Sequence, residues 1–205
     1  MVRYSSDMAG VRQGVRTRTA SVEVTASLID AALVLLEEAG LSALTVRAVA
    51  TRAGVAPMGV YSRFGNKDGL LEVLFVHGFD TLRIAIETPS DANPLRRLSI
   101  GCLGYRQFAI DNPQLYHLMF EQMMLLELSP ESREAAKRSF TTLVDRVQDA
   151  MNSGDLANGD STEVAQELWS AMHGAAGLEI AGVHFAQDRA ANFTAMINAL
   201  IRGLG

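Results

Sequence analysis

The sequence contains a single cysteine, no long hydrophobic run and no signal-peptide pattern. One thiol cannot form an intramolecular disulfide, which fits a reducing compartment, and we expect Cys102 to be a buried small apolar residue. The longest uninterrupted apolar stretch, six residues from Ala31 to Leu36, is far shorter than the roughly 20 residues of a membrane-spanning helix. The polar N-terminus has no apolar signal core. We therefore expect a cytoplasmic protein with no membrane partner.

Motifs of catalysis are also missing. The chain has no glycine-rich phosphate loop, no H-E-x-x-H, no G-x-S-x-G and no cysteine pair. Its four histidines lie in different segments. His173 and His184, on one expected helix, would be about 16 Å apart, too far to share a metal ion. We expect no cofactor, no metal site and no enzymatic activity; a helical-bundle enzyme is the alternative from another class.

The apolar residues recur with helical periodicity, and no strand-like alternation is present. With 205 residues, of which 48% are hydrophobic, the chain is long enough for a small domain plus a larger one. We predict an all-α fold of about nine helices, in which an N-terminal three-helix helix-turn-helix domain precedes a larger C-terminal helical bundle. The predicted helices cover residues 25–39, 45–53, 57–64, 67–88, 95–110, 113–128, 130–151, 162–185 and 188–202.

The net charge of −5 is unevenly distributed. Residues 1–70 contain eight Lys/Arg against six Asp/Glu, whereas residues 71–205 contain ten against seventeen. Phosphate contacts provide much of the affinity for duplex DNA, so positive charge is expected where the duplex lies. Residues 1–22 carry four arginines against one aspartate and lack periodicity. This flexible basic arm either enters a minor groove or only solubilises the protein.

One stretch in the first third of the chain has the pattern of a helix-turn-helix. Thr45 is a good N-cap for a short amphipathic helix, and Gly54 can adopt the positive φ of a sharp turn. Pro57 suits the first turn of a second helix. In that helix Val60 and Phe64 are four residues apart and can be buried together. Two short helices joined in this way form a DNA-reading unit, and the second helix lies in the major groove.

The spacing in this stretch resembles that of the TetR (tetracycline-repressor-like) transcriptional regulators, over about residues 25–74. The shared register, beginning at Thr45, is T-x3-V-A-x2-A-G-V-A-x3-V-Y-x2-F-x2-K-x2-L. The resemblance implies that Tyr61 and Lys67 contact phosphates. It also implies that Thr45 and Arg47 anchor the first helix on the DNA backbone. The residues that would face base edges are Pro57, Met58, Gly59, Ser62 and Arg63.

We divide the chain into three parts. Residues 1–22 are the arm, 23–68 the helix-turn-helix DNA-binding domain, and 69–205 the C-terminal ligand-sensing and dimerisation domain. The helix that begins at Lys67 connects the last two parts, and its N-terminus attracts phosphate. The segment 88–94, which contains two prolines, ends this helix.

The run WSAMHGAAGLE, which begins at Trp169, resembles the Trp/His-Gly motif of one subgroup of TetR-type C-terminal domains. A helix with so many glycines loses roughly 1 kcal/mol per glycine relative to alanine, so close packing has to compensate. A symmetric partner provides such packing, with two helices from each protomer. We expect a homodimer, because a palindromic operator presents two half-sites about 34 Å apart. The predicted interface residues are Gly174, Gly177, Leu178, Ala181 and Gly182.

Methionine and aromatic side chains from three predicted helices form the candidate effector pocket. Methionine-rich apolar surfaces adapt to varied ligands, and pockets between bundle helices are common. The same spacing also fits ordinary core packing, and His173 also fits a packed histidine satisfied by a neighbour. The predicted pocket residues are Tyr105, Phe108, Met119, Phe120, Met123, Trp169, Met172 and His173.

These observations predict a sequence-specific DNA-binding transcriptional regulator. The resemblance implies repression as the default mode, with the repressor released from its operator by a small apolar effector. Such an effector acts through its different affinities for the DNA-binding and released states. The alternative is a ligand-independent DNA-binding or partner-binding helical protein whose core is filled.

Overall fold

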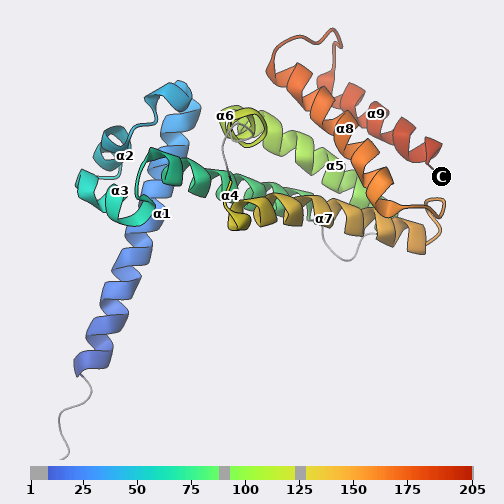
Figure 1. Ribbon diagram of the computed structural model, residues 1–205. Helices are drawn as coiled ribbons and strands as arrows, with labels where there is room; N and C mark the ends of the chain where they lie inside the picture. Colours follow the sequence, from blue (N-terminus) through green and yellow to red (C-terminus); the bar gives the residue numbers. More distant parts are fainter. Residues whose placement is uncertain (1–8, 88–92, 123–127, 205) are drawn as a thin grey trace, which may run out of the picture. The chain divides into compact units, whose positions relative to one another are not determined.

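The computed structural model describes residues 9–87, 93–122 and 128–204 (Figure 1). Nine α-helices and one π-helical turn make up most of this part of the chain, which contains no β-strand, and the predicted all-α class is confirmed. The chain divides into two compact units between Leu74 and Phe75. The elements are α1 (Ala9–Ala43), α2 (Val46–Arg52), α3 (Pro57–Phe64), α4 (Lys67–Ile86), α5 (Pro94–Asp111), α6 (Pro113–His117), the π-helical turn η1 (Leu118–Gln122), α7 (Pro130–Asn152), α8 (Ser161–Ile180) and α9 (Arg189–Gly203).

Helix α1 begins earlier than the sequence predicted. An irregular arm was expected up to residue 22, whereas the helix starts at Ala9. Extending an existing amphipathic helix costs less than nucleating a new one, so a segment without its own periodicity can continue it. Thr25 is therefore not an N-cap: its hydroxyl donates to the carbonyl oxygen of Ser21, 3.0 Å away. The predicted stop at Gly40 is confirmed by its φ of 72°.

Helices α2 and α3 form the predicted helix-turn-helix. Thr45 caps α2, because its Oγ1 accepts a hydrogen bond from the backbone N–H of Ala48 at 3.1 Å. Gly54 in the turn has a φ of 67°, a conformation that residues with a Cβ rarely adopt. On α3, Val60 and Phe64 are both buried. The local turn chemistry read from the sequence therefore fixes the angle between the two helices.

Helix α4 is continuous from Lys67 to Ile86 and contributes residues to both units. Asn66 directly precedes the helix, and its Oδ1 accepts a hydrogen bond from the N–H of Gly69 at 2.8 Å. Most of the predicted breaker, residues 88–92, lies outside the described residues. No helix of the described chain is both long and apolar enough to cross a membrane.

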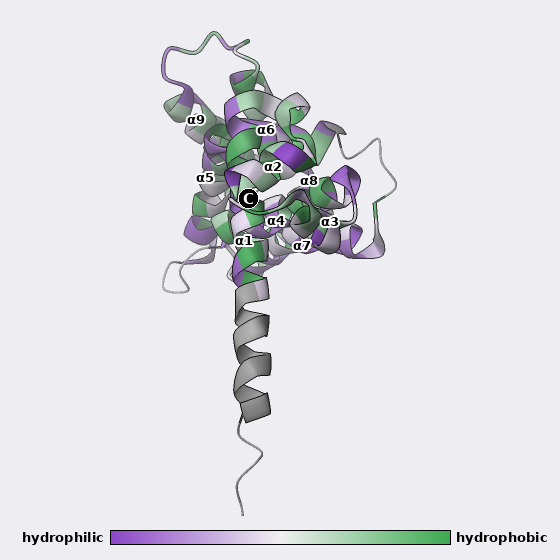
Figure 2. Cartoon of the chain, turned by 90° about the vertical axis from the view of Figure 1, so that its left-hand side faces the viewer, coloured by the Kyte–Doolittle hydropathy of each residue, from purple (hydrophilic) through white to green (hydrophobic). Residues whose placement is uncertain are grey.

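Helix α5 is the central element of the second unit and contacts α7, α8 and α9. Cys102 on this helix is fully buried, as predicted, and burial raises the pKa of its thiol to about 12. Two glycines allow α5 to approach the end of α4 closely. A Cβ on Gly101 would lie 2.9 Å from the carbonyl oxygen of Ile86, and a Cβ on Gly104 only 2.0 Å from that of Ala85. Figure 2 shows that individual helices carry both hydrophilic and hydrophobic residues, as expected for amphipathic helices.

Two predicted helices of the second unit end early. The α-helix expected over 113–128 ends at His117, and the chain continues as the π-helical turn η1. In a π-helix each backbone hydrogen bond joins residues five apart, instead of four as in an α-helix. Residues 123–127 lie outside the described chain. The helix expected to reach Phe185 ends at Ile180, because Gly182 adopts a φ of 71° two residues later.

Candidate functional site

The outward face of α3 is the first candidate site. Val60 and Phe64 face inward, whereas Tyr61 and Ser62 between them are exposed. Met58 is 72% exposed and Tyr61 49% exposed, both unusually high for large apolar or aromatic side chains. Pro57 and Ser62 are exposed too, and Gly59 is half-buried. This face contains Pro57, Met58, Gly59 and Ser62, four of the five residues predicted to face base edges.

Arg63, predicted to face base edges, is held within the first unit. Its Nε donates to the Thr25 hydroxyl at 3.1 Å, and its Nη1 donates to the carbonyl oxygen of Gly59 at 3.0 Å. The guanidinium thus joins α3 to α1. The sequence could not indicate this contact, because Thr25 precedes Arg63 by 38 residues.

The residues expected to hold the DNA backbone flank α3 in sequence. Arg47 on α2 is exposed, and Thr45 is exposed although its hydroxyl serves as the cap. Lys67 is half-buried at the first turn of α4, where its Nζ donates to the carbonyl oxygen of Leu41 at 3.4 Å. A lysine at a helix N-terminus combines two positive potentials, which suits a phosphate oxygen.

A cavity of about 320 Å³ in the second unit is the second candidate site. Four of the predicted pocket residues line it: Tyr105, Met119, Phe120 and Trp169. Phe108 and Met172 are buried but do not line it, and neither does His173. Met123 lies outside the described residues. The remaining lining residues come mainly from α4 and α7: Phe75, Phe79, Leu82, Ile86, Leu128, Arg133, Ala136, Ser139, Phe140, Leu143 and Gln166.

The α4 and α7 walls of the cavity have a helical spacing that is visible in the sequence. Phe75, Phe79, Leu82 and Ile86 follow the i, i+4, i+7, i+11 spacing of one helical face. The α7 residues Ala136, Ser139, Phe140 and Leu143 follow the i, i+3, i+4, i+7 spacing, which also places them on one helical face. Such stripes predict burial, but only the tertiary structure shows that they surround a space.

Four polar side chains form a hydrogen-bonded chain beside this cavity. Trp169 donates its indole N–H to the Tyr105 hydroxyl at 3.2 Å, and the hydroxyls of Tyr105 and Tyr116 are 2.8 Å apart. The Tyr116 hydroxyl lies 2.6 Å from Nδ1 of His173. The rings pack together as well, with the centroids of Tyr116 and His173 5.5 Å apart. His173 is therefore satisfied by neighbours instead of facing the cavity.

Burial sets the protonation of this chain. Desolvation raises the pKa of Tyr105 to about 12. Desolvation also raises the pKa of Tyr116, and the nearby Tyr105 raises it in addition. Desolvation lowers the pKa of His173, and the Glu121 carboxylate opposes this only in part. With His173 neutral and its proton on Nε2, Nδ1 accepts a hydrogen bond from the Tyr116 hydroxyl, which can in turn accept one from Tyr105. Each group in the chain then has a partner.

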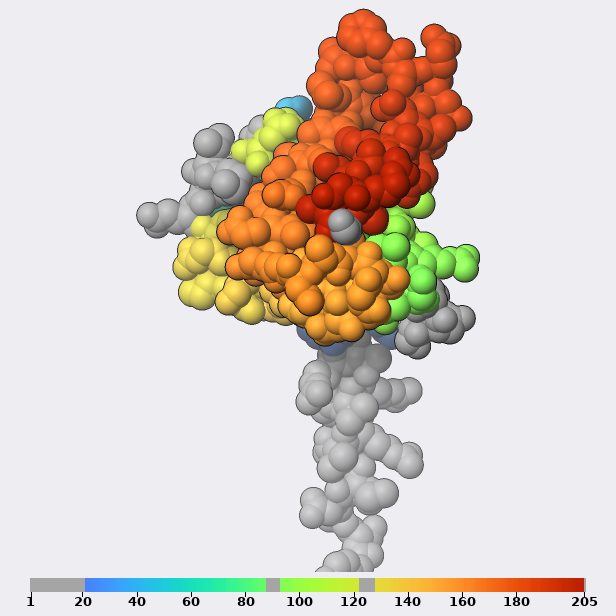
Figure 3. Space-filling model, turned by 90° about the vertical axis from the view of Figure 1, so that its right-hand side faces the viewer, coloured from blue at the N-terminus to red at the C-terminus, as the bar shows by residue number. Residues whose placement is uncertain are grey.

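The α8 and α9 surface contains the residues predicted for dimerisation. Gly174, Ala181 and Gly182 are exposed and Gly177 is half-buried, and no atoms lie within 4 Å of a Cβ built on any of the three glycines. Leu178 is 55% exposed, and Phe185, in the α8–α9 loop, is fully exposed. In Figure 3 the orange and red atoms of these two helices form much of the visible face. This part of the surface is apolar and unpartnered in a single protomer.

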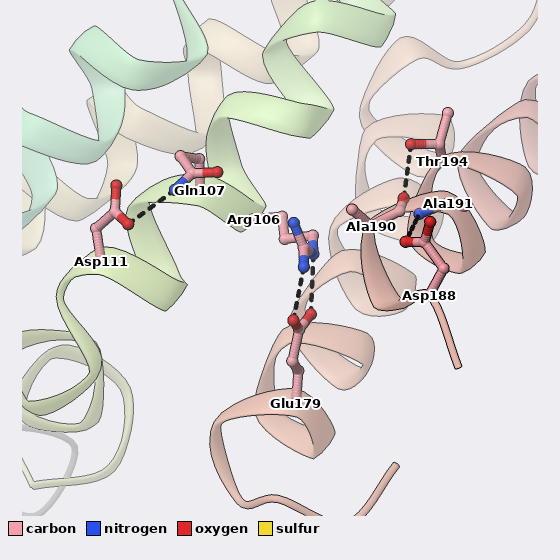
Figure 4. Close-up of polar contacts among 8 residues, drawn as sticks. All are labelled: Arg106, Gln107, Asp111, Glu179, Asp188, Ala190, Ala191 and Thr194. Atoms are coloured by element: carbon pink, nitrogen blue, oxygen red, sulfur yellow. Dashed lines mark hydrogen bonds and ion pairs between the residues drawn. The ribbon is translucent and has the colours of Figure 1, made fainter. Parts of the chain in front are cut away.

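A partly buried ion pair holds this region of α8 in place. Arg106 of α5 and Glu179 of α8 point toward each other, with Nε–Oε2 and Nη2–Oε1 distances of 2.9 and 2.6 Å (Figure 4). The Arg106 guanidinium also lies 5.8 Å from the ring centre of Phe193 on α9. The pair thus connects α5, α8 and α9. Among the side chains that the structure describes, no group of His, Cys, Asp and Glu could hold a metal ion.

Two family models match the chain. Residues 28–74 match the bacterial regulatory proteins of the tetR family, and residues 98–200 match the tetracyclin repressor-like C-terminal domain. The second match by itself covers half of the chain, and the first covers the helix-turn-helix. The chain belongs to the TetR family of transcriptional regulators.

The chain is also similar to individual proteins and to a solved structure. The chain is 26% identical over 179 residues to the HTH-type transcriptional regulator Rv0681 of Mycobacterium tuberculosis, which covers 87% of this chain and 80% of that protein. It is 50% identical to the HTH-type transcriptional regulator BetI of Burkholderia thailandensis, but over only 52 residues, which are 25% of this chain and 27% of BetI. A solved structure from Rhodococcus sp. RHA1 is similar with a TM-score of 0.78 and 26% identity, over 88% of this chain and 95% of that one.

Proposed function

We propose that this TetR-family regulator is a homodimeric repressor that binds a palindromic operator and leaves it when a small apolar molecule occupies the cavity of the second unit. It acts in the cytoplasm, where the operator DNA is, and performs no catalysis. The exposed face of α3, with Met58 and Tyr61, carries the DNA-binding part of this proposal. The cavity of about 320 Å³ carries the effector part, because a ligand-independent regulator needs no such space.

Helix α4 provides a physical route from effector to DNA. Its second half forms one wall of the cavity through Phe75, Phe79, Leu82 and Ile86. Its first residue is Lys67, beside the helix-turn-helix in sequence. A ligand that displaces the cavity wall therefore displaces part of a continuous helix. Release follows only if the ligand binds the released state more tightly than the DNA-bound state.

Dimerisation follows from the size of the DNA-reading surface. Helix α3 has eight residues and reaches few base pairs. Two copies, related by a two-fold axis, read two half-sites and multiply the specificity. The exposed apolar surface of α8 and the α8–α9 loop supports a self-association site in the second unit.

The DNA-binding proposal is tested with duplex DNA flanking the protein's own coding region, by fluorescence anisotropy at low salt. We expect Tyr61→Ala to weaken binding at least tenfold, since it removes an exposed aromatic contact. Ile84→Ala, which shortens an equally exposed apolar side chain on α4, is the matched control and should bind as the wild type does. A wild-type protein that shows no preference for this DNA over unrelated duplexes would contradict the proposal.

A further inference from the structure

One polar group in the cavity wall has no partner. Ser139 of α7 lines the cavity and is only 3% exposed. Among the residues that the structure describes, no hydrogen bond of its hydroxyl is found. A hydroxyl on the wall of an apolar cavity is unfavourable until a bound molecule satisfies its hydrogen-bonding capacity.

The other polar groups around the cavity are occupied. The hydroxyl of Tyr105 and the indole N–H of Trp169 bond to each other. Gln166 donates its Nε2 to the hydroxyl of Ser170 at 3.1 Å. Arg133, which is exposed, donates to the carbonyl oxygen of Leu128. Ser139 therefore differs from these three side chains and Tyr105, because no hydrogen bond of its hydroxyl to a described residue is found.

We propose that the cavity takes a neutral, mainly hydrocarbon molecule with one oxygen function, such as a ketone, ester or alcohol, and that the Ser139 hydroxyl hydrogen-bonds this oxygen. The proposal rests on the proposed function in treating the cavity as the effector site. It adds the chemical class of the ligand and the residue that selects it.

The walls of the cavity argue against a charged ligand group at Ser139. Arg133 is the cationic side chain of the described lining, and it precedes Ser139 by six residues, about 9 Å along α7. A carboxylate at Ser139 would be buried among apolar side chains without a counter-ion, which is strongly unfavourable. A carbonyl or hydroxyl oxygen needs only the one hydrogen bond that Ser139 offers.

The volume limits the size of the ligand. At the packing density of protein interiors, about 320 Å³ holds on the order of a dozen non-hydrogen atoms. Three probes of this size share one carbon skeleton: 4-phenyl-2-butanone, n-butylbenzene and 4-phenylbutyrate. They differ in having a ketone, no oxygen and a carboxylate. The fluorescence of Trp169, which lines the cavity and is the sole tryptophan of the chain, reports binding.

The test compares the wild type with Ser139→Ala. We expect the substitution to weaken binding of the ketone roughly three- to tenfold and to leave the affinity for n-butylbenzene unchanged, because only the ketone uses the hydroxyl. The wild type should bind the ketone at least tenfold more tightly than the carboxylate. Without probe, Ser139→Ala should not lower the melting temperature, since the lost hydroxyl has no partner.

Ser132→Ala is the matched control. Ser132 is also buried on α7, but it bonds to Ser129 and does not line the cavity. This variant should lose stability and keep the probe affinities of the wild type. Equal effects of Ser139→Ala on ketone and hydrocarbon, tight carboxylate binding, or no binding of any probe would each overturn the ligand assignment. Operator binding, measured on the same samples without probe, shows separately whether the DNA-binding function stands.

Discussion

His173 shows how burial of one side chain can make stability depend on pH. Its pKa in the folded protein lies below the ordinary 6.5, whereas in the unfolded chain it returns to that value. Below about pH 6.5 the unfolded chain therefore binds a proton that the folded protein does not. We expect the free energy of unfolding to be highest above pH 6.5 and to fall with pH until the lowered pKa of the folded state is reached.

Urea unfolding of wild type and His173→Asn between about pH 4.5 and about pH 8 measures this effect. Asparagine keeps an acceptor for the Tyr116 hydroxyl but does not titrate. The stability difference between the two proteins should therefore shrink as the pH falls through about 6.5. A constant difference across this range would show that His173 is not held neutral by its surroundings.

We predict that Lys67 contacts a phosphate of the DNA backbone. If its ammonium neutralises one phosphate, Lys67→Ala should weaken binding to specific and unrelated duplexes alike. The slope of log K against log salt should become shallower by about one unit. Lys137→Ala, which removes an exposed lysine of α7, should change neither. A change in base preference with an unaltered salt slope would contradict the phosphate role. Circular dichroism checks that losing the contact with Leu41 leaves the fold intact.

Single residues also show where prediction from sequence ends. The Thr45 cap and the Gly54 turn could be predicted because each depends on neighbours in the chain. The contact between Arg63 and Thr25 could not, because it joins residues 38 positions apart. Phe108 and Met172 are apolar residues of the kind that lines pockets. Whether such a residue lines a cavity or packs against another side chain depends on how several helices cross, which the sequence does not reveal.

The contact between helices α4 and α5 depends on a missing side chain. A Cβ on Gly104 would lie 2.0 Å from the carbonyl oxygen of Ala85, which is backbone and cannot rotate away. Gly104→Ala should therefore force the helices apart and destabilise the protein by about 1–3 kcal/mol or more, despite the better helix propensity of alanine. Thermal and urea unfolding measure the change.

Gly203→Ala provides the comparison for this helix contact. It adds the same methyl group at the end of α9, where no atom lies within 4 Å. Its effect should stay within about 0.5 kcal/mol. If Gly104→Ala were equally mild, the close approach of α4 and α5 would not be needed for stability.

Most helices could be predicted, because their starts depend on local caps such as Asn93, Ser129 and Asp160. The ends of some helices differ from those predicted. Propagation carried α1 back to Ala9, and Gly182 ended α8 before Phe185. The wall of the cavity formed by α4 and α7 has a readable apolar stripe, but a stripe predicts only burial. The cavity exists because the apolar side chains of these helices do not fill the space between them.

The molecule as a whole needs a second copy of itself for the proposed function. One protomer offers a single short recognition helix and leaves Leu178 and Phe185 exposed on the α8 and α9 side. Apolar side chains on an isologous surface are buried twice over when a two-fold axis passes nearby. The same association would supply both half-site contacts, so dimerisation and operator affinity should fail together.

Leu178→Glu tests this coupling. Glutamate in a buried self-association surface would remain unpaired on both protomers, which costs several kcal/mol per dimer. We expect the variant to sediment as a folded monomer at micromolar concentration and to lose operator affinity by at least a hundredfold, because one half-site contact is lost. Ile84→Glu adds the same charge at an equally exposed position of α4 and should remain dimeric. A monomeric variant that still binds the operator tightly would separate the two properties, and a dimeric Leu178→Glu would place the partner surface elsewhere.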